Sequence, residues 1–351
     1  MTDLFIKVRT HQEQNLPFVI FSKPDSSKTV GLFQKNDHLY FLEKFDKKGF
    51  VFAPFDSEII PFLPLQFCDV YVEKNNFSTY FFEDNNSFNL GNDHFEETVV
   101  KAVDSIKNKK FEKVVISRRE LFELKNFDIE LFFKKSLQNY PSAFNYCFYH
   151  PKVGLWLGAT PEQLLKTKES NFETVALAGT QKVDSIEKVV WTEKEINEQQ
   201  LVTDFIVESI KDFTKELNVS NPKTVKAGSI FHIKTKISGK LKSKKAVEKV
   251  IKSLHPTSAV CGMPRESAKE FIIQNEGYNR EYYSGFLGEL NIDFTSFRTQ
   301  HSDLYVNLRC LKIVENTAQI FVGCGITAES NPKDEYLETV NKAMTMKKII
   351  A

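Results

Sequence analysis

The stretch AFNYCFYHPKVGLWLG, residues 143–158, indicates the fold class of this chain most directly. Residues 143–149 and 153–158 are runs of aromatic and aliphatic side chains. Between them, His150-Pro151-Lys152 is a sequence typical of a turn. Two such runs joined by a short turn predict a β-hairpin.

A second hairpin is predicted directly after the first, from residues 163–167 and 173–177 around Glu169-Ser170-Asn171. Strands joined by short turns pair antiparallel. Hydrophobic periodicity predicts further strands at 113–117, 229–237, 283–290, 304–314 and 319–324, and helices near 92–110, 187–217, 246–254, 265–275 and 333–348. Helices inserted among hairpins predict an α+β fold with antiparallel sheets rather than a doubly wound parallel sheet.

The composition describes a globular chain of 351 residues with a formal net charge of +1, which gives no general attraction to nucleic acid or an anionic membrane. Residues 1–90 are expected to form short strands and turns. The five cysteines are widely spaced without a CxxC pair, which predicts reduced thiols in a cytoplasmic protein and no zinc finger. We expect neither a signal peptide nor a membrane span, because no apolar run is long enough.

Chemistry is first indicated near the C-terminus, where Gly323-Cys324-Gly325 is expected to form a turn that leads into a helix. Glu335, Glu338 and Lys342 recur at i, i+3 and i+7, so they share one face of that helix. Two carboxylates and an amine suit a divalent cation and an anionic ligand. The same charges are also common on a solvated helix face.

A matching pair of carboxylates, Glu195 and Glu198, lies three residues apart in the predicted long helix. Two helices that each offer such a pair can hold an octahedral Mg²⁺. An acidic first turn also favours the helix dipole, so this pair taken alone is more simply a structural feature.

Two further residues suit proton transfer. Lys113 precedes an apolar run at 114–116, where desolvation favours the neutral amine that a general base requires. Glu162 follows Gly158-Ala159-Thr160-Pro161 between two predicted strands, and an apolar site there would raise the pKa of the carboxyl and make it a general acid. In isolation, a snorkelling lysine and an ordinary turn are the simpler interpretations.

Several positions could bind an anion or a ring. Gly179 permits close backbone approach, and Thr180 offers a hydroxyl. His232 and Thr235 share one predicted strand, where a lone histidine is more often structural than catalytic. Arg309 lies in an apolar predicted strand and needs an anionic partner, which a bidentate carboxylate would supply.

In order and spacing, nine short motifs resemble those of the chorismate-utilising enzymes, which include isochorismate, salicylate, anthranilate and aminodeoxychorismate synthases. The motifs are Lys113-Val-Val-Ile-Ser-Arg118, Gly158-Ala-Thr-Pro-Glu162, Leu177-Ala-Gly-Thr180, Glu195-Ile-Asn-Glu198, His232-Ile-Lys-Thr235, Leu254-His-Pro-Thr257, Arg309-Cys310, Gly323-Cys-Gly325 and Glu335-Tyr-Leu-Glu338-Thr-Val-Asn-Lys342. The resemblance covers residues 92–346. It implies one chorismate-binding domain over 1–351, with stacked antiparallel sheets as a sandwich core, helices packed outside, and a variable β-rich part at 1–91.

Two positions distinguish members of this family. Nitrogen-adding members carry glutamine where Lys113 stands, and aminodeoxychorismate synthases typically carry a nucleophilic lysine where Ala178 stands. The resemblance therefore implies an isochorismate synthase without a glutamine amidotransferase partner. A salicylate synthase, which also eliminates pyruvate, is the nearest alternative. A non-catalytic chorismate-binding protein is the alternative from another class, and it would need neither Lys113 nor Glu162.

The resemblance also implies catalytic roles. Lys113 removes a proton from the water that attacks C2 of chorismate, and Glu162 protonates the leaving C4 hydroxyl. His232 lies near the ring. The implied ligands of Mg²⁺, directly or through water, are Glu198, Glu338, Glu195 and Glu335. The implied substrate-binding residues are Gly179, Thr180, Thr235, Ala259, Arg309, Gly323 and Lys342.

Three residues depart from the family pattern. Glu195 stands where an aspartate is frequent, Gln199 replaces a histidine, and Ser258 replaces a proline. The resemblance implies a cytoplasmic monomer. The short, stand-alone form of the chain favours a role in menaquinone biosynthesis, with siderophore biosynthesis as the other possibility.

Overall fold

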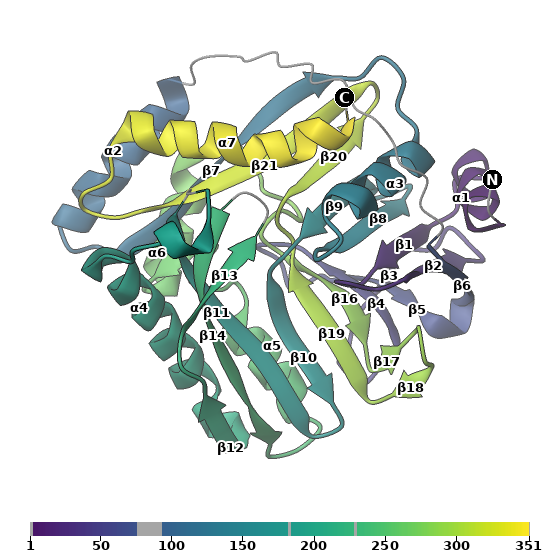
Figure 1. The fold of residues 1–351 in the computed structure, drawn as a ribbon. Helices are drawn as coiled ribbons and strands as arrows, with labels where there is room; N and C mark the ends of the chain where they lie inside the picture. Colours follow the sequence, from purple (N-terminus) through teal and green to yellow (C-terminus); the bar gives the residue numbers. More distant parts are fainter. Residues whose placement is uncertain (1–2, 76–92, 182–183, 228–229, 351) are drawn as a thin grey trace.

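The computed structural model describes residues 3–75, 93–181, 184–227 and 230–350 (Figure 1). Two large antiparallel sheets form the core of this part of the chain. The nine strands of the first sheet are, in order, β15 (Gly262–Met263), β7 (Lys113–Glu123), β21 (Thr317–Ile326), β20 (Cys310–Val314), β9 (Gly154–Thr160), β8 (Phe144–His150), β1 (Phe18–Ser22), β2 (Lys28–Gln34) and β6 (Cys68–Lys74).

The second sheet has ten strands, nine of them on one path that begins beside helices shown on one side of the molecule in Figure 1. Its strands are, in order, β12 (Thr214–Val219), β14 (Ile230–Leu241), β11 (Asn171–Gln181), β10 (Gln163–Lys168), β19 (His301–Val306), β16 (Phe286–Leu290), β4 (Gly49–Ala53), β5 (Pro61–Pro64) and β3 (Tyr40–Phe41), with β13 (Lys223–Ala227) also paired to β14. A small separate sheet joins β17 (Ile292–Asp293) to β18 (Arg298–Thr299).

The α+β class with antiparallel sheets is confirmed, as are both predicted hairpins. In the first hairpin Phe148 pairs with Trp156, and in the second Lys166 pairs with Glu173. The two sheets pack face to face through aromatic rings. Phe52 stacks on Phe148 at a centroid distance of 4.3 Å, so β4 of the second sheet contacts β8 of the first. Burying this apolar area between the sheets is the main stabilising contribution of the core.

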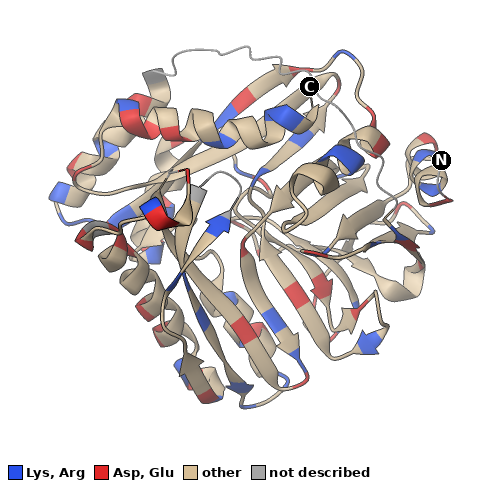
Figure 2. Cartoon of the chain, in the orientation of Figure 1, with Lys and Arg blue, Asp and Glu red and all other residues tan. Residues whose placement is uncertain are grey.

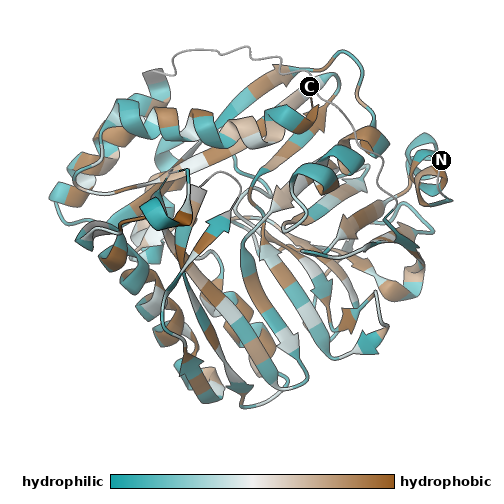
Figure 3. Ribbon diagram, in the orientation of Figure 1, coloured by the Kyte–Doolittle hydropathy of each residue, from teal (hydrophilic) through white to brown (hydrophobic). Residues whose placement is uncertain are grey.

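Helices cover the outer faces of both sheets. Their bounds are α1 (Asp3–Glu13), α2 (Asp93–Lys107), α3 (Ile129–Asn139), α4 (Glu193–Ile210), α5 (Ala246–Leu254), α6 (Arg265–Asn275) and α7 (Pro332–Ile350), with 3₁₀ turns η1 (Leu65–Phe67), η2 (Ile186–Lys188) and η3 (Lys211–Phe213). One buried cluster joins α1, α3 and α7 to the first sheet, and another joins α4 and α5 to the second. Hydrophilic and hydrophobic residues alternate along the helices, and charges of both signs are spread over them (Figures 2 and 3).

Four sequence predictions of local structure were wrong. Residues 3–13 form a helix, although only strands and turns were expected before residue 90. The predicted helix 187–217 forms only over 193–210, because Thr192 and Glu195 make a capping box at its start. Gly323 and Gly325 lie inside β21 rather than in a turn.

The fourth wrong prediction concerns the strand expected over residues 304–314. Two strands, β19 and β20, take its place, and they belong to different sheets. The chain bends at residues 307–309, where Arg309 has a φ of 47°. The buried Asn307 side chain holds this bend, since it accepts a hydrogen bond from Tyr146 Oη (2.6 Å) and donates one to the carbonyl of Tyr282 (2.8 Å).

All five cysteines are free and buried, as predicted for reduced thiols. Among the described residues, no helix has both the length and the apolar character needed to cross a membrane.

Candidate active site

Two connections that cross between the sheets lie side by side. Residues 161–162 lead from β9 to β10, and residues 307–309 lead from β19 to β20. Backbone hydrogen bonds join them, from Val306 N to Glu162 O (2.9 Å) and from Ala159 N to Arg309 O (3.0 Å). Side chains on these connections therefore reach the junction of the two sheets.

A cavity of about 980 Å³, including its open mouth, lies at this junction. Strands of both sheets, the two crossings, α4 and α7 contribute to its wall. Ten of the fourteen predicted site residues line it: Lys113, Glu162, Gly179, His232, Ala259, Arg309, Gly323, Lys342, Glu198 and Glu338.

Glu162 faces this cavity from the first crossing. Burial raises the pKa of its carboxyl to about 7, and the positive charges of Arg309, Lys113 and Lys342 oppose that rise. A carboxyl with such a pKa still carries a proton in a large fraction of molecules near neutral pH. It can therefore act as a general acid.

Lys113 begins β7 and enters the cavity beside Gly325 of the neighbouring strand β21. A β-carbon at position 325 would lie 2.9 Å from Lys113 Cε, so a side chain there would displace the lysine. The Lys113 ammonium donates to Glu198 Oε1 of α4 at 2.7 Å. This ion pair holds an amine at one end of the cavity.

Two more cations face the same space. Lys342 of α7 donates to the carbonyl of Gly323 (2.9 Å) and pairs with Glu338 (2.6 Å). Burial lowers the pKa of Arg309, with Tyr283 and Glu338 acting in the opposite direction. In the described part of the chain, no carboxylate lies within ion-pair distance of the Arg309 guanidinium, so the bidentate contact predicted for it is open to an anionic ligand.

His232 of β14 is held in one tautomer. Its Nδ1 donates to the carbonyl of Gly179, at 2.9 Å, because a carbonyl oxygen only accepts. Burial lowers the pKa of the imidazole, so the ring is neutral near pH 7. Gly179 has a φ of +70° at an irregularity in the β11–β14 register, a conformation that favours glycine.

Three of the other four predicted site residues do not line the cavity. Thr235 is 2% exposed and accepts a hydrogen bond from Gln199 Nε2 (2.7 Å). Glu195 accepts from the backbone of Thr192 (2.8 Å) as part of the helix cap, and Glu335 accepts from Ser330 Oγ (2.7 Å). The side chain of Thr180 lies outside the described residues.

The structure shows the surroundings of two of the residues that depart from the family pattern, Gln199 and Ser258. Gln199, directly after Glu198 in sequence, is buried. Its Nε2 donates to Thr203 of the same helix (3.0 Å) and to Thr235 of β14 (2.7 Å), and the second bond links α4 to β14. It thus fixes the part of α4 that presents Glu198. Ser258 is buried, and its Oγ has no hydrogen-bond partner among the described residues.

Two of the four glutamates predicted to bind a divalent cation line the cavity. Glu198 and Glu338 line the cavity from different helices, and Mg²⁺ prefers carboxylate oxygens while keeping several positions for water and ligand. Within the described ranges, no three His, Cys, Asp or Glu residues are grouped as a metal site. In this structure the two cavity carboxylates accept from lysines, Glu198 from Lys113 and Glu338 from Lys342.

Sequence reasoning did not identify the residues that support the cavity wall. Arg280 and Glu276 form a buried ion pair, with side chains 2% and 1% exposed. Arg280 donates to the carbonyls of Val115 (2.7 Å) and Val260 (2.9 Å), and Glu276 accepts from Ser117 N (2.6 Å). Val115 and Val260 both line the cavity. The i,i+4 spacing of Glu276 and Arg280 is a local signal for the pair, but only the fold brings it against Val115, Ser117 and Val260.

Replacing Arg280 with methionine is expected to lower the free energy of unfolding by about 3–5 kcal/mol, because Glu276 would be left buried without its charge partner. Urea unfolding followed by circular dichroism measures this change. The exposed Arg298→Met on β18 is the control and should change stability by less than about 0.5 kcal/mol. Equal effects of the two variants would show that the buried pair does not support the fold.

Comparison with known proteins adds family information to this geometry. Residues 72–351 match the model of a family described as chorismate binding enzymes. The isochorismate synthase EntC of Escherichia coli K12 is 28% identical over 264 residues, which are 72% of this chain and 66% of that protein, just under two thirds of its length.

Two solved structures share the fold. A Bacillus anthracis protein described as the 2,3-dihydroxybenzoate-specific isochorismate synthase DhbC superposes with a TM-score of 0.79 at 20% identity, covering 98% of this chain and 99% of that chain. MenF, described as the menaquinone-specific isochorismate synthase of Escherichia coli, has a TM-score of 0.80 at 19% identity, covering 95% and 89%.

Proposed function

This chain belongs to the family of chorismate-binding enzymes, and from that premise we propose that it is an isochorismate synthase. The observation that carries the proposal is the pairing of a lysine, Lys113, with a carboxyl of raised pKa, Glu162, in one cavity that also holds Arg309 and Lys342. A base and an acid are both needed to add water at one ring carbon and remove a hydroxyl from another. Binding alone requires neither.

The cations suit the charge of the substrate. Chorismate carries two carboxylates, and Arg309 offers a fixed fork of donors suited to one of them. Lys342 lies on the same wall beside the Gly323 carbonyl and would bind the same group. Because desolvation strengthens charge-assisted contacts, two cations suffice to orient the enolpyruvyl carboxylate.

The proton transfers follow from the positions of Lys113 and Glu162. In the structure the Lys113 ammonium donates to Glu198, so this ion pair has to separate and the ammonium has to release a proton to solvent before the neutral amine accepts one from water. That water then attacks C2 of chorismate, the ring double bonds shift, and Glu162 donates its proton to the C4 hydroxyl as it leaves. The neutral His232 ring, fixed by Gly179, lies beside the ring of the ligand.

We further propose that Glu198 and Glu338 hold Mg²⁺, with Glu195 and Glu335 acting through water if they take part. A bound cation would supply positive charge to the ring carboxylate of chorismate. The carboxylates of Glu198 and Glu338, which line one cavity from two different helices, support this assignment.

Incubation with chorismate and Mg²⁺ is expected to yield isochorismate, detected by liquid chromatography, and EDTA is expected to abolish turnover. Restoring Mg²⁺ should restore it. Pyruvate is measured in the same samples, since its release would identify a salicylate synthase instead. If chorismate binds by calorimetry but no product forms with Mg²⁺ present, the protein binds chorismate without catalysis.

The rate is expected to fall as the pH rises through about 7, because the catalytic form of Glu162 is the protonated one. The sign follows from the raised pKa of the carboxyl, which keeps its proton below this pH and loses it above. His232 titrates on the acidic side of its usual range, so it does not cause the alkaline decrease. A profile of kcat/KM between about pH 5.5 and 9 measures the effect, and a rate that keeps rising to pH 9 would contradict it.

We also propose that the product feeds menaquinone biosynthesis, the role named for the structurally similar MenF. Deleting the gene should then create a growth requirement that a quinone precursor relieves. Relief by a catecholate iron chelator alone would favour the siderophore role.

A further inference from the structure

Glu162 lies between two cavities. It lines the large cavity described above and also a smaller neighbouring space of about 290 Å³, a volume that includes the opening of this space. Leu177 and Ala259 are the other residues common to both linings. These three residues form the partition between the two spaces, so one side of the Glu162 carboxyl faces the protein interior.

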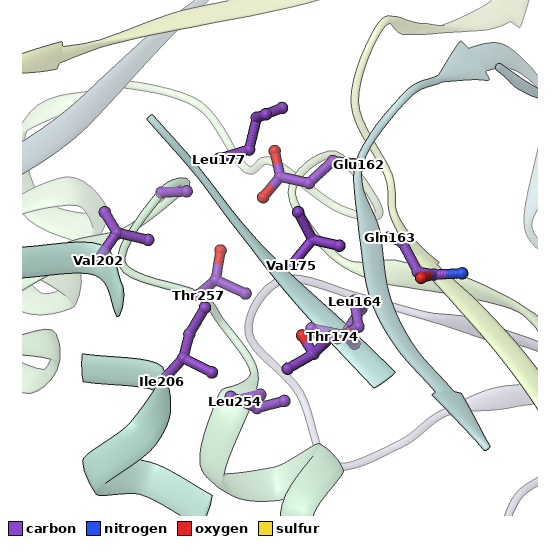
Figure 4. A pocket seen from close by; sticks show the side chains of 11 residues that line it. Glu162, Gln163, Leu164, Thr174, Val175, Leu177, Val202, Ile206, Leu254 and Thr257 are labelled. Carbon is purple, nitrogen blue, oxygen red and sulfur yellow. Dashed lines mark hydrogen bonds between the residues drawn. The ribbon is translucent and has the colours of Figure 1, made fainter. Parts of the chain in front are cut away.

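The wall of this smaller space is mostly apolar, but it contains one unsatisfied hydroxyl. Its apolar members are Leu164, Val175, Leu177, Val202, Ile206, Leu254 and Ala259. Thr257 is 8% exposed, and its Oγ1 has no hydrogen-bond partner among the residues that the structure describes. Figure 4 shows this hydroxyl and the Glu162 carboxyl directed toward the same space.

The other polar side chains of the wall are already satisfied. Thr174 Oγ1 donates to the carbonyl of Leu164 at 2.7 Å, and Gln163 Nε2 donates to Asp303 at 3.0 Å. The Thr257 hydroxyl and the Glu162 carboxyl are therefore the two polar groups left to face this space. Burial of an unpaired hydroxyl is unfavourable, whereas a water bonded to two or more polar groups removes that penalty.

We propose that Thr257 is a positioning residue for the general acid, and that it holds a single water against the Glu162 carboxyl on the side away from the substrate. The proposal rests on the assignment of Glu162 as the acid. One oxygen of the Glu162 carboxyl is then hydrogen-bonded to Thr257 through the water. The other oxygen carries the proton and faces the substrate cavity.

This water has a defined effect on the reaction. When Glu162 gives its proton to the leaving hydroxyl, a carboxylate forms next to apolar residues, and a hydrogen bond from the water stabilises it. Arg309, Lys113 and Lys342 act on the carboxyl from the substrate side, and only the water acts from the interior side. Over one turnover Lys113 gains one proton and Glu162 loses one, so the starting state is restored when Lys113 releases a proton to solvent and Glu162 takes one up.

The test compares Thr257→Val, which removes the hydroxyl at nearly constant volume, with Thr257→Ser, which keeps it. The valine variant is expected to lower kcat about 10- to 100-fold with little change in KM, and to move the alkaline decrease in kcat to higher pH. The serine variant should behave as the wild type. Val175→Ile, which adds a methyl group to the wall and leaves Thr257 in place, is expected to displace the water and reproduce the valine effect.

A second measurement does not depend on turnover. NMR titration of the ¹³C-labelled Glu162 carboxyl should show a higher pKa in Thr257→Val than in Thr257→Ser, and a high-resolution crystal structure should show the water. If the two variants titrate identically, the proposal is overturned whatever the activity. If the titration differs as expected but no isochorismate forms, the link from Thr257 to Glu162 stands and the proposed function fails.

Discussion

Replacing Glu162 with glutamine is expected to lower kcat by about 10²–10⁴-fold while chorismate still binds. Glutamine has nearly the same shape but cannot donate an acidic proton. The loss should be large because burial raises the pKa of this carboxyl to about 7 in the same cavity as the predicted base. Stopped assays with chromatographic product detection give kcat, and calorimetry gives the dissociation constant.

Glu169→Gln is the matched control, since this exposed carboxylate lies in the turn after β10 and outside the cavity. It should leave both constants unchanged. Full turnover by Glu162→Gln would remove the acid from the mechanism. A loss of binding with the same kcat at saturation would indicate that Glu162 only holds the ligand.

Replacing Lys113 with methionine is expected to have an equally large effect on kcat, about 10²–10⁴-fold, because no amine would remain at this end of the cavity to accept a proton from water. Methionine keeps the length and apolar packing of the side chain beside Gly325. The exposed Lys110→Met, three residues upstream, controls for the loss of one positive charge.

Lys113→Arg distinguishes a base from a charge partner. Arginine can keep the ion pair with Glu198 but does not lose its proton in proteins, so a base is lost and a cation is retained. We expect this variant to be as inactive as Lys113→Met. Wild-type turnover by Lys113→Arg would mean that position 113 contributes charge alone and that another group activates the water.

Local sequence patterns predicted much of the fold because hairpins and amphipathic helices are coded by neighbouring residues. The hairpin at 143–158 forms as β8 and β9, and the helices at 246–254 and 265–275 have the predicted bounds. The errors came where a run of apolar residues crosses between sheets, as at Arg309, or where a cap shortens a helix, as at Thr192. Hydrophobic periodicity reveals neither event, because the crossing depends on contacts with distant segments and the cap depends on a local polar pair, Thr192 and Glu195.

The candidate site was predicted to a similar extent. Spacing along a helix placed Glu338 and Lys342 together, and the structure pairs them at 2.6 Å. Spacing did not predict where two other side chains lie. Glu195 caps its own helix, and Thr235 is hydrogen-bonded by Gln199. A charged or polar residue near a site has several competing partners, and only the packed chain decides which one it takes.

The sequence by itself therefore determined the family, the antiparallel α+β class and the set of charged residues available for chemistry, because these depend on residue type and on short-range spacing. The tertiary structure alone decided which of those residues meet. It brought Glu162 and Arg309 together by running two sheet crossings side by side. It also raised the pKa of Glu162 by burial and placed Thr257 behind it, since desolvation and proximity arise only when distant segments pack.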